Sequence, residues 1–173
     1  MLSFIFASQI NSIKLIMKKT FLSLILLSFV GFGALQAQDY GTGIGIRGGP
    51  AQGITVKHFI SSTNALEGIV STRWHGWAIT GLYEIHAEPF NIRELKAFYG
   101  AGAHIGYWYD PDAPWADAGS EYTIVGIDAV LGLEYAFDEI PISVSLDWKP
   151  AFNFIGITGG WFDGGGFSVR YIF

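Results

Sequence analysis

Apolar and polar residues alternate along most of the chain after residue 40, with a period of two residues rather than the 3.6 of an amphipathic helix. Between residues 142 and 154 the sequence ISVSLDWKPAFNF places apolar side chains at every even position and mainly polar ones between them. The sequence YTIVGIDAVLGLEYAF, residues 122–137, alternates in the same way. This pattern predicts β-strands with one apolar and one polar face.

Eight segments show this alternation, some of them clearly and others more weakly. They lie at residues 40–49, 53–60, 66–74, 77–86, 95–109, 122–137, 142–154 and 167–173. The connections after the first and third segments are very short, whereas those after the fifth and seventh, DPDAPWADAGSE and GITGGWFDGGG, are long. An even number of antiparallel strands puts both ends of the chain on one side, so we expect the long loops on the opposite rim.

Two closed architectures accept eight such strands: a soluble lipocalin-like ligand-binding barrel with an apolar lumen, and a membrane barrel with an apolar exterior. The polar face distinguishes them, because it carries glycines, small residues and nearly balanced charge, which suit a narrow interior where charges pair. Its charged residues form the predicted lumen network: Arg47, Lys57, Glu67, Arg73, Glu84, Lys96, Asp128, Glu134, Asp147, Lys149 and Arg170.

The sequence therefore predicts an all-β fold, an eight-stranded antiparallel up-and-down transmembrane β-barrel with a side-chain-filled polar lumen. A membrane-spanning sheet must close, because an open edge would leave backbone groups unsatisfied in lipid. The soluble barrel is the less favoured alternative. Within the lumen, arginines and acids are expected to face one another, namely Arg47, Arg73 and Arg170 against Glu67, Asp128, Glu134 and Asp147.

Composition supports the membrane barrel. Half of the 173 residues are hydrophobic and only 14% are charged, which is too apolar for an ordinary soluble surface. Aromatic residues gather toward both ends of the strands and form two candidate interface girdles: Trp74, Trp77, Trp108 and Tyr109 at one end, and Tyr135, Phe137, Tyr171 and Phe173 at the other. Phe98 and Trp108 also count among the side chains expected to fill the interior, so no open pore for large solutes is predicted.

The N-terminal region has the pattern of a targeting segment. Residues 17–37, MKKTFLSLILLSFVGFGALQA, have a basic start, an apolar run and small residues before the expected cleavage site, and therefore predict a secretory signal peptide. A single membrane anchor is the alternative, although the apolar run is slightly short for a span. Residues 1–16 are an upstream extension or a mis-called start, and residues 38–173 form the barrel. Cleavage before Gln38 leaves 7 basic and 15 acidic residues, so nucleic acid is not an expected partner.

The chain ends with FSVRYIF, in which Phe167, Val169, Tyr171 and Phe173 alternate with other residues up to the last position. With the leader and the strand count, this ending resembles the small eight-stranded outer-membrane barrel proteins of Gram-negative bacteria, of the OmpX and OmpA-barrel kind. The resemblance implies that these four residues are the signal read by the barrel assembly machinery. It also implies export through a cleaved signal peptide and location in the cell outer membrane.

Candidate chemistry is sparse. The chain has no cysteine, and its four histidines, His58, His75, His86 and His104, have no zinc-site spacing, so no metal or cofactor is expected. The glycine-rich stretches precede no helical pattern and are therefore interpreted as structural rather than phosphate-binding. Some barrels of this size remodel lipid A acyl chains with Ser, His and an acid. An acyl-chain hydrolase or transferase is therefore the enzymatic alternative, with Ser71, Ser120 and His75 near the outer rim.

The favoured function is a structural or surface-interaction role in the outer membrane, without enzymatic activity. The expected partners are outer-membrane lipid and lipopolysaccharide, the barrel assembly machinery and periplasmic chaperones, and the barrel is expected to be a monomer. The ligand of the outer loops cannot be predicted. Pro150 departs from the pattern, because it lies inside a strand and cannot donate a hydrogen bond, so we expect a bulge there.

Overall fold

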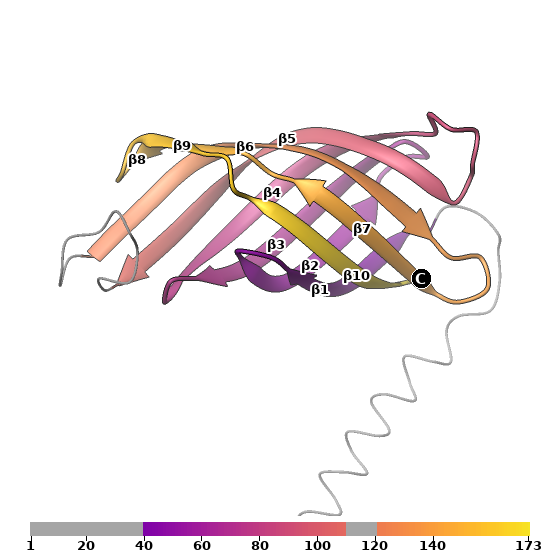
Figure 1. The fold of residues 1–173 in the computed structure, drawn as a ribbon, viewed down its shortest axis with the longest axis horizontal. Helices are drawn as coiled ribbons and strands as arrows, with labels where there is room; N and C mark the ends of the chain where they lie inside the picture. Colours follow the sequence, from indigo (N-terminus) through magenta and orange to yellow (C-terminus); the bar gives the residue numbers. More distant parts are fainter. Residues whose placement is uncertain (1–39, 110–120) are drawn as a thin grey trace, which may run out of the picture. The chain divides into compact units, whose positions relative to one another are not determined.

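The computed structural model describes residues 40–109 and 121–173, so the predicted leader and most of the long connection after residue 109 lie outside the described residues. The described part contains strands and their connections (Figure 1): β1 (Thr42–Gly48), β2 (Gln52–Phe59), β3 (Asn64–Arg73), β4 (Gly76–Ala87), β5 (Leu95–Tyr109), β6 (Glu121–Ala136), β7 (Ile142–Trp148), β8 (Ala151–Ile155), β9 (Gly159–Trp161) and β10 (Gly165–Ile172). Within these ranges no helix is long and apolar enough to cross a membrane.

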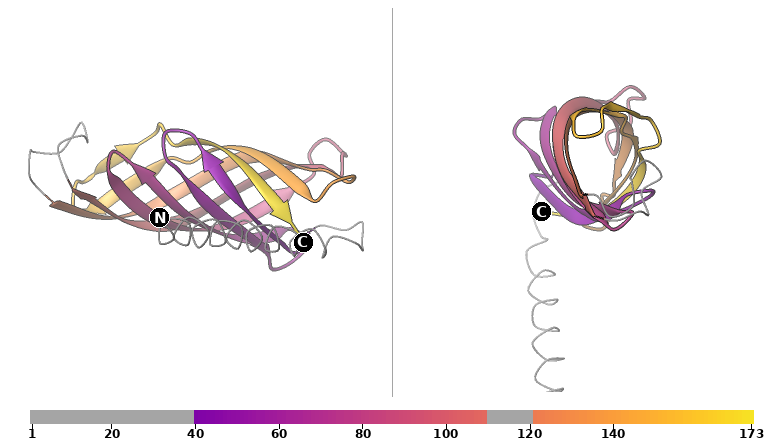
Figure 2. Two further views of the ribbon diagram at one scale, coloured as in Figure 1. Left: turned by 90° about the horizontal axis from the view of Figure 1, so that it is seen from below. Right: turned by 90° about the vertical axis from the view of Figure 1, so that its left-hand side faces the viewer.

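The strands close into an antiparallel barrel. Each of β1 to β6 pairs with its sequence neighbour, and β1 also pairs with β10. At this seam the amide of Thr42 donates to the carbonyl of Phe173 at 2.9 Å and the amide of Phe173 donates back at 2.8 Å. Seen from one end, the strands form a ring (Figure 2). The prediction of a closed antiparallel barrel is confirmed.

Two of the eight barrel strands are interrupted. β7 and β8 both pair with β6 and form the seventh barrel strand, while β9 and β10 pair with β8 and β7 and form the eighth. The eight predicted segments therefore correspond to the eight barrel strands. The segment 156–166 was expected to be entirely loop, but it contains β9, which extends the eighth barrel strand toward the rim.

The strand that contains Pro150 has a bulge, as expected, but it lies beyond the proline: Gly126 pairs with Asn153 and Val125 with Ile155, so Phe154 is the extra residue. β6 and the seventh barrel strand keep one register on both sides of Pro150. The amide of Ala129 donates to the carbonyl of Pro150 at 2.9 Å, so the proline still serves as an acceptor. In a hydrogen-bonded antiparallel pair both bonds join the same two residues, so the N–H that Pro150 lacks would have faced Ala129, and only one of the two bonds of this pair forms.

A second irregularity lies in the eighth barrel strand. Trp148 pairs with Gly165, and Ala151 pairs with Trp161. Between these two pairs the seventh barrel strand advances by three residues and the eighth by four. The eighth barrel strand therefore has one extra residue, which forms a bulge opposite Pro150. This bulge carries Asp163 to the rim.

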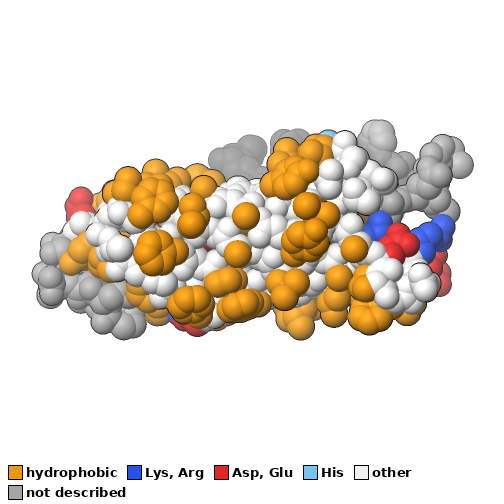
Figure 3. Space-filling model, turned by 90° about the horizontal axis from the view of Figure 1, so that it is seen from above, with side chains coloured by type: hydrophobic (Ala, Val, Ile, Leu, Met, Phe, Trp, Pro, Cys, Tyr) orange, Lys and Arg blue, Asp and Glu red, His pale blue; other side chains and the backbone are white. Residues whose placement is uncertain are grey.

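The two faces of the barrel wall have opposite character. The inward face carries the charges of the strands, and eight of the predicted lumen residues are buried: Arg47, Lys57, Glu67, Glu84, Asp128, Glu134, Asp147 and Arg170. The outward face carries exposed aliphatic and aromatic side chains, among them Ile46, which is 68% exposed, and Leu146, which is 64% exposed. In Figure 3 apolar side chains cover the face shown, and charged ones lie mainly toward its ends.

Inward glycines make room for large inward side chains. A Cβ atom added to Gly106 would lie 2.3 Å from the ring of Trp108, and one added to Gly166 would lie 2.1 Å from the guanidinium of Arg47. Such distances are far inside van der Waals contact, so any larger residue would displace its neighbour. The glycines of the polar face are therefore part of the packing of the lumen.

Candidate functional site

The half of the lumen nearer the chain ends contains a dense ionic cluster. Lys57 Nζ lies 2.8 Å from Glu84 Oε2, 3.1 Å from Glu134 Oε2 and 3.6 Å from Glu67 Oε2. Arg170 lies 2.5 Å from Glu67 Oε1 and 3.6 Å from Glu134 Oε1. We call these five residues the inner cluster. None of their side chains is more than 4% exposed.

Neutral side chains add hydrogen bonds to the inner cluster, in which Glu84 Oε1 alone among the carboxylate oxygens has no partner from the described residues. Thr55 donates to Glu67, and Tyr40 donates to Glu134. Ser145 Oγ accepts a 2.9 Å bond from Arg170, and His86 Nε2 lies 3.1 Å from Glu84 Oε2. Buried ions are tolerated when such bonds replace the lost water, so removing one member would leave its partners desolvated and unpaired.

A layer of buried apolar side chains on one wall separates this cluster from the outer half of the lumen. It consists of Ile69, Leu82, Phe98 and Val130, contributed by four consecutive strands from β3 to β6. On the opposite wall Arg47 makes two hydrogen bonds to Asp147, of 2.5 and 2.6 Å. Two parallel bonds of this kind fix both side chains.

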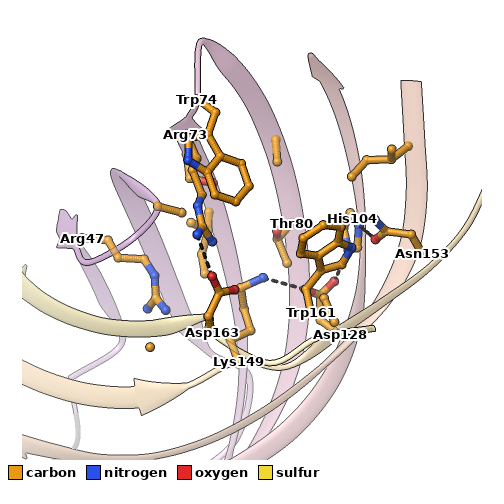
Figure 4. Close-up of a pocket in the computed structure, with 18 of the residues that line it drawn as sticks. Arg47, Arg73, Trp74, Thr80, His104, Asp128, Lys149, Asn153, Trp161 and Asp163 are labelled. Atoms are coloured by element: carbon orange, nitrogen blue, oxygen red, sulfur yellow. Dashed lines mark hydrogen bonds and ion pairs between the residues drawn. The ribbon is translucent and has the colours of Figure 1, made fainter. Parts of the chain in front are cut away.

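The outer half contains a cavity with a volume of about 120 Å³ (Figure 4). Asp128 lies in its wall and binds His104 Nδ1 at 2.7 Å and Lys149 Nζ at 2.5 Å. The second ring nitrogen of His104, Nε2, lies 2.9 Å from Asn153 Oδ1. Trp108 and Ile124 form a buried apolar cluster in the same wall. We call this space the outer cavity.

An ion pair and two indole rings lie at the mouth of the outer cavity. Arg73 on β3 binds Asp163 at 2.6 Å, and its guanidinium stacks 3.7 Å from the ring centre of Trp74. Trp74 and Trp161 meet edge to face with ring centres 6.5 Å apart. The hydrogen bond from Arg73 lowers the pKa of Asp163 below its ordinary value. Since β3 and β9 are not neighbours in the sheet, these contacts span the mouth.

The charged residues predicted to face the lumen are buried to different degrees. Eight are buried, and Arg73, Lys96 and Lys149 are half-buried near the two ends. The ammonium of Lys96 lies 5.7 Å from the ring centre of Phe59. Arg47 and Arg170 meet acids of the expected set, but Arg73 pairs with Asp163, which sequence reasoning missed. No alternation marks Asp163, because it lies on a bulge within a glycine-rich segment.

The aromatic predictions are partly wrong. Trp77, Tyr109 and Tyr135 are exposed on the outer surface. Trp108 is only 8% exposed and lies inside, where its indole N–H donates to the carbonyl of Arg73 at 3.0 Å, and Trp74 packs against it. These two rings therefore do not belong to an outward girdle.

The reason lies in register and turn geometry. Trp108 falls on the same face of β5 as His104, and the glycines beside it leave space for the ring. Trp74 has a positive φ of 47° in the β3–β4 turn, so its backbone leaves the strand alternation.

Near the chain ends the residues of the second predicted girdle differ in exposure. Phe137 is half-buried and packs edge to face on Tyr135, with ring centres 4.9 Å apart. Of the four terminal residues, Phe167 and Phe173 are exposed, and Val169 and Tyr171 are half-buried.

Among residues 40–109 and 121–173, the serine and histidine of the enzymatic alternative are not brought together. Ser71 is buried at the outer cavity, whereas His75 is exposed in the β3–β4 turn, and Ser120 lies outside the described residues. Both ring nitrogens of His104 already have partners, which leaves neither to accept a proton from a hydroxyl.

Two further observations concern metal binding and similarity to known proteins. Within residues 40–109 and 121–173, no group of three or more His, Asp or Glu side chains could hold a metal ion. Comparison of the chain with protein-family models, curated protein sequences and solved structures finds no match.

Proposed function

We propose that the protein is an integral outer-membrane β-barrel that resembles the OmpX and OmpA-barrel proteins and has a structural or surface-interaction role. One observation carries this proposal: the barrel is apolar outside and charged inside. Outward residues such as Ile46, Leu146 and Ile127 are more than half exposed, while Lys57 and Arg170 are fully buried. Water does not favour such an arrangement, but a hydrocarbon environment does.

The same observation argues against a soluble lipocalin-like barrel. A barrel of that kind would bury its apolar face in the lumen and expose the polar one. Here the lumen holds the inner cluster, and the apolar layer of Ile69, Leu82, Phe98 and Val130 fills much of the space beside it. A lumen filled in this way supports a barrel without an open pore.

The barrel end opposite the chain termini is the surface-exposed rim in this proposal. The signal peptide directs export, and the C-terminal residues Phe167, Val169, Tyr171 and Phe173 contact the assembly machinery after delivery by periplasmic chaperones. Lipid and lipopolysaccharide surround the monomeric barrel. No described residue indicates the ligand of the rim, so the partner of the surface role is left open.

Fractionation of Gram-negative cells that express the full chain tests the membrane location. The protein should be recovered in the outer-membrane fraction with Gln38 as its first residue. Unheated samples should migrate differently from boiled ones, because a closed barrel resists detergent until heated. Recovery in the soluble periplasm without detergent would contradict the proposal.

The terminal signal can be tested separately with Phe173→Asp. At the membrane interface an acidic residue costs about 0–1 kcal/mol, so the refolded variant should retain the heat-dependent mobility shift. Its level in the outer membrane should nevertheless fall, because assembly reads the terminal residue. Ile155→Asp, at another exposed position, is the matched control and should leave assembly less affected. Wild-type levels of Phe173→Asp would refute the signal.

A further inference from the structure

The outer cavity has hydrogen-bonding capacity that the described residues do not use. Ser71 and Thr80 line it, are 8% and 3% exposed, and receive no hydrogen-bond partner for their hydroxyls from residues 40–109 and 121–173. Neither hydroxyl oxygen is among the fully buried atoms that lack a partner, so both are reachable from the cavity, and a molecule in it can hydrogen-bond to them.

The unused groups are mainly donors. Lys149 has three N–H groups, of which one reaches Asp128 Oδ1. Both oxygens of Asp128 are already occupied, one by Lys149 and one by His104. The charged residues of the cavity wall are three cations and two acids: Arg47, Arg73, Lys149, Asp128 and Asp163. Because Arg47 is also paired with Asp147, each cation of the wall has an acid partner. The donors that remain are the other N–H groups of Lys149 and the two hydroxyls, and a molecule that accepts hydrogen bonds fits them.

The rest of the wall is apolar. The same space is lined by the apolar side chains of Ile69, Ala78, Trp108 and Ile124. The volume of about 120 Å³ is close to that of an engineered cavity of roughly 150 Å³ that binds benzene. The space therefore suits a body no larger than a single ring.

We propose that the outer cavity binds a small organic carboxylate with a compact apolar body. The carboxylate accepts hydrogen bonds from Ser71, Thr80 and Lys149, and the body packs against Trp108 and Ile124. This site goes beyond the proposed membrane role and needs only the closed barrel, so a failure of membrane placement would not remove it.

Titration calorimetry with benzoate tests the site on the refolded full barrel in detergent. Benzoate should bind saturably at one site, and benzylamine, which has the same ring and the opposite charge, should bind at least tenfold more weakly. The double variant Ser71→Ala/Thr80→Val should weaken benzoate binding by about tenfold, as expected for lost hydrogen bonds to a charged group. Thr72→Val changes the adjacent, outward residue and should leave binding unchanged.

A second variant tests the volume of the cavity. Ala78→Leu fills it and should abolish benzoate binding, whereas Ala103→Leu adds the same atoms to the exposed face of β5 and should not. The heat-dependent mobility shift shows whether each variant is folded. If a variant is not folded, the single variant Thr80→Val is measured in its place and should also weaken benzoate binding. The proposal is overturned if benzoate shows no saturable binding, if benzylamine binds equally well, or if Ala78→Leu binds like wild type. The first result would mean that water alone fills the cavity, the second that the site does not select a carboxylate, and the third that benzoate binds elsewhere.

Discussion

The two halves of the lumen use charge in different ways. In the inner cluster every charged side chain meets an opposite charge, and the side chains fill the space. In the outer half the ion pairs lie in the walls around a cavity, which the side chains of Ser71 and Thr80 also line. One half is thus built for cohesion, and the other leaves room for a ligand.

The largest effect is expected from breaking the inner cluster. Arg170→Met removes the partner of Glu67 and Glu134 and leaves buried carboxylates unpaired, which should lower the free energy of unfolding by about 3–5 kcal/mol. Urea unfolding of the lipid-reconstituted barrel measures this loss. Arg73→Met is the matched control at the exposed mouth and should cost at most about 1 kcal/mol. Equal losses in the free energy of unfolding would mean that the inner cluster stabilises the barrel no more than the ion pair at the mouth does.

A smaller effect is expected from overfilling the lumen. Gly166→Ala places a methyl group against Arg47, whose guanidinium is held by Asp147. Overpacking of this kind typically costs about 1–3 kcal/mol. Gly68 has no atom within 4 Å of an added Cβ, so Gly68→Ala should be neutral in the same unfolding measurement. A neutral Gly166→Ala would show that the lumen is loosely packed there.

The smallest effect concerns the ion pair at the mouth. A carboxyl with a lowered pKa, such as Asp163, stabilises the fold above its unfolded pKa of about 3.9 and loses that contribution as the pH falls through the lower folded value. Because the Asp163 side chain is 54% exposed, Asp163→Asn should cost less than about 1 kcal/mol at neutral pH. The difference from wild type should vanish in strong acid and shrink in high salt. A difference that is constant with pH would exclude the ion pair as its cause.

The sequence predicts one part of this molecule much better than another. A period of two is enough to assign Lys57, Glu84 and Arg170 to the lumen, because the alternation around each of them is unbroken. It cannot assign Trp74 or Asp163, because a turn with positive φ and a bulge take these residues out of the alternation.

The partners of lumen residues are a second limit. Lys149 meets Asp128 across the β6–β8 side of the lumen, and His104 meets Asn153 from another strand. Such contacts depend on the stagger of strands around the ring, which alternation within one segment does not determine. The cavity is less predictable still, since it depends on the volumes of all inward side chains together.

The central claim is that the exposed apolar face of the barrel contacts lipid. The chain has six tryptophans, and two of them form a matched pair: Trp148 is 47% exposed on the outer surface, and Trp108 is 8% exposed in the lumen. Single-tryptophan variants that retain one or the other, reconstituted in vesicles of brominated lipid, test the claim by fluorescence quenching. Strong quenching of Trp148 with little quenching of Trp108 is the predicted result. Equal quenching of the two, or none of Trp148, would contradict the account.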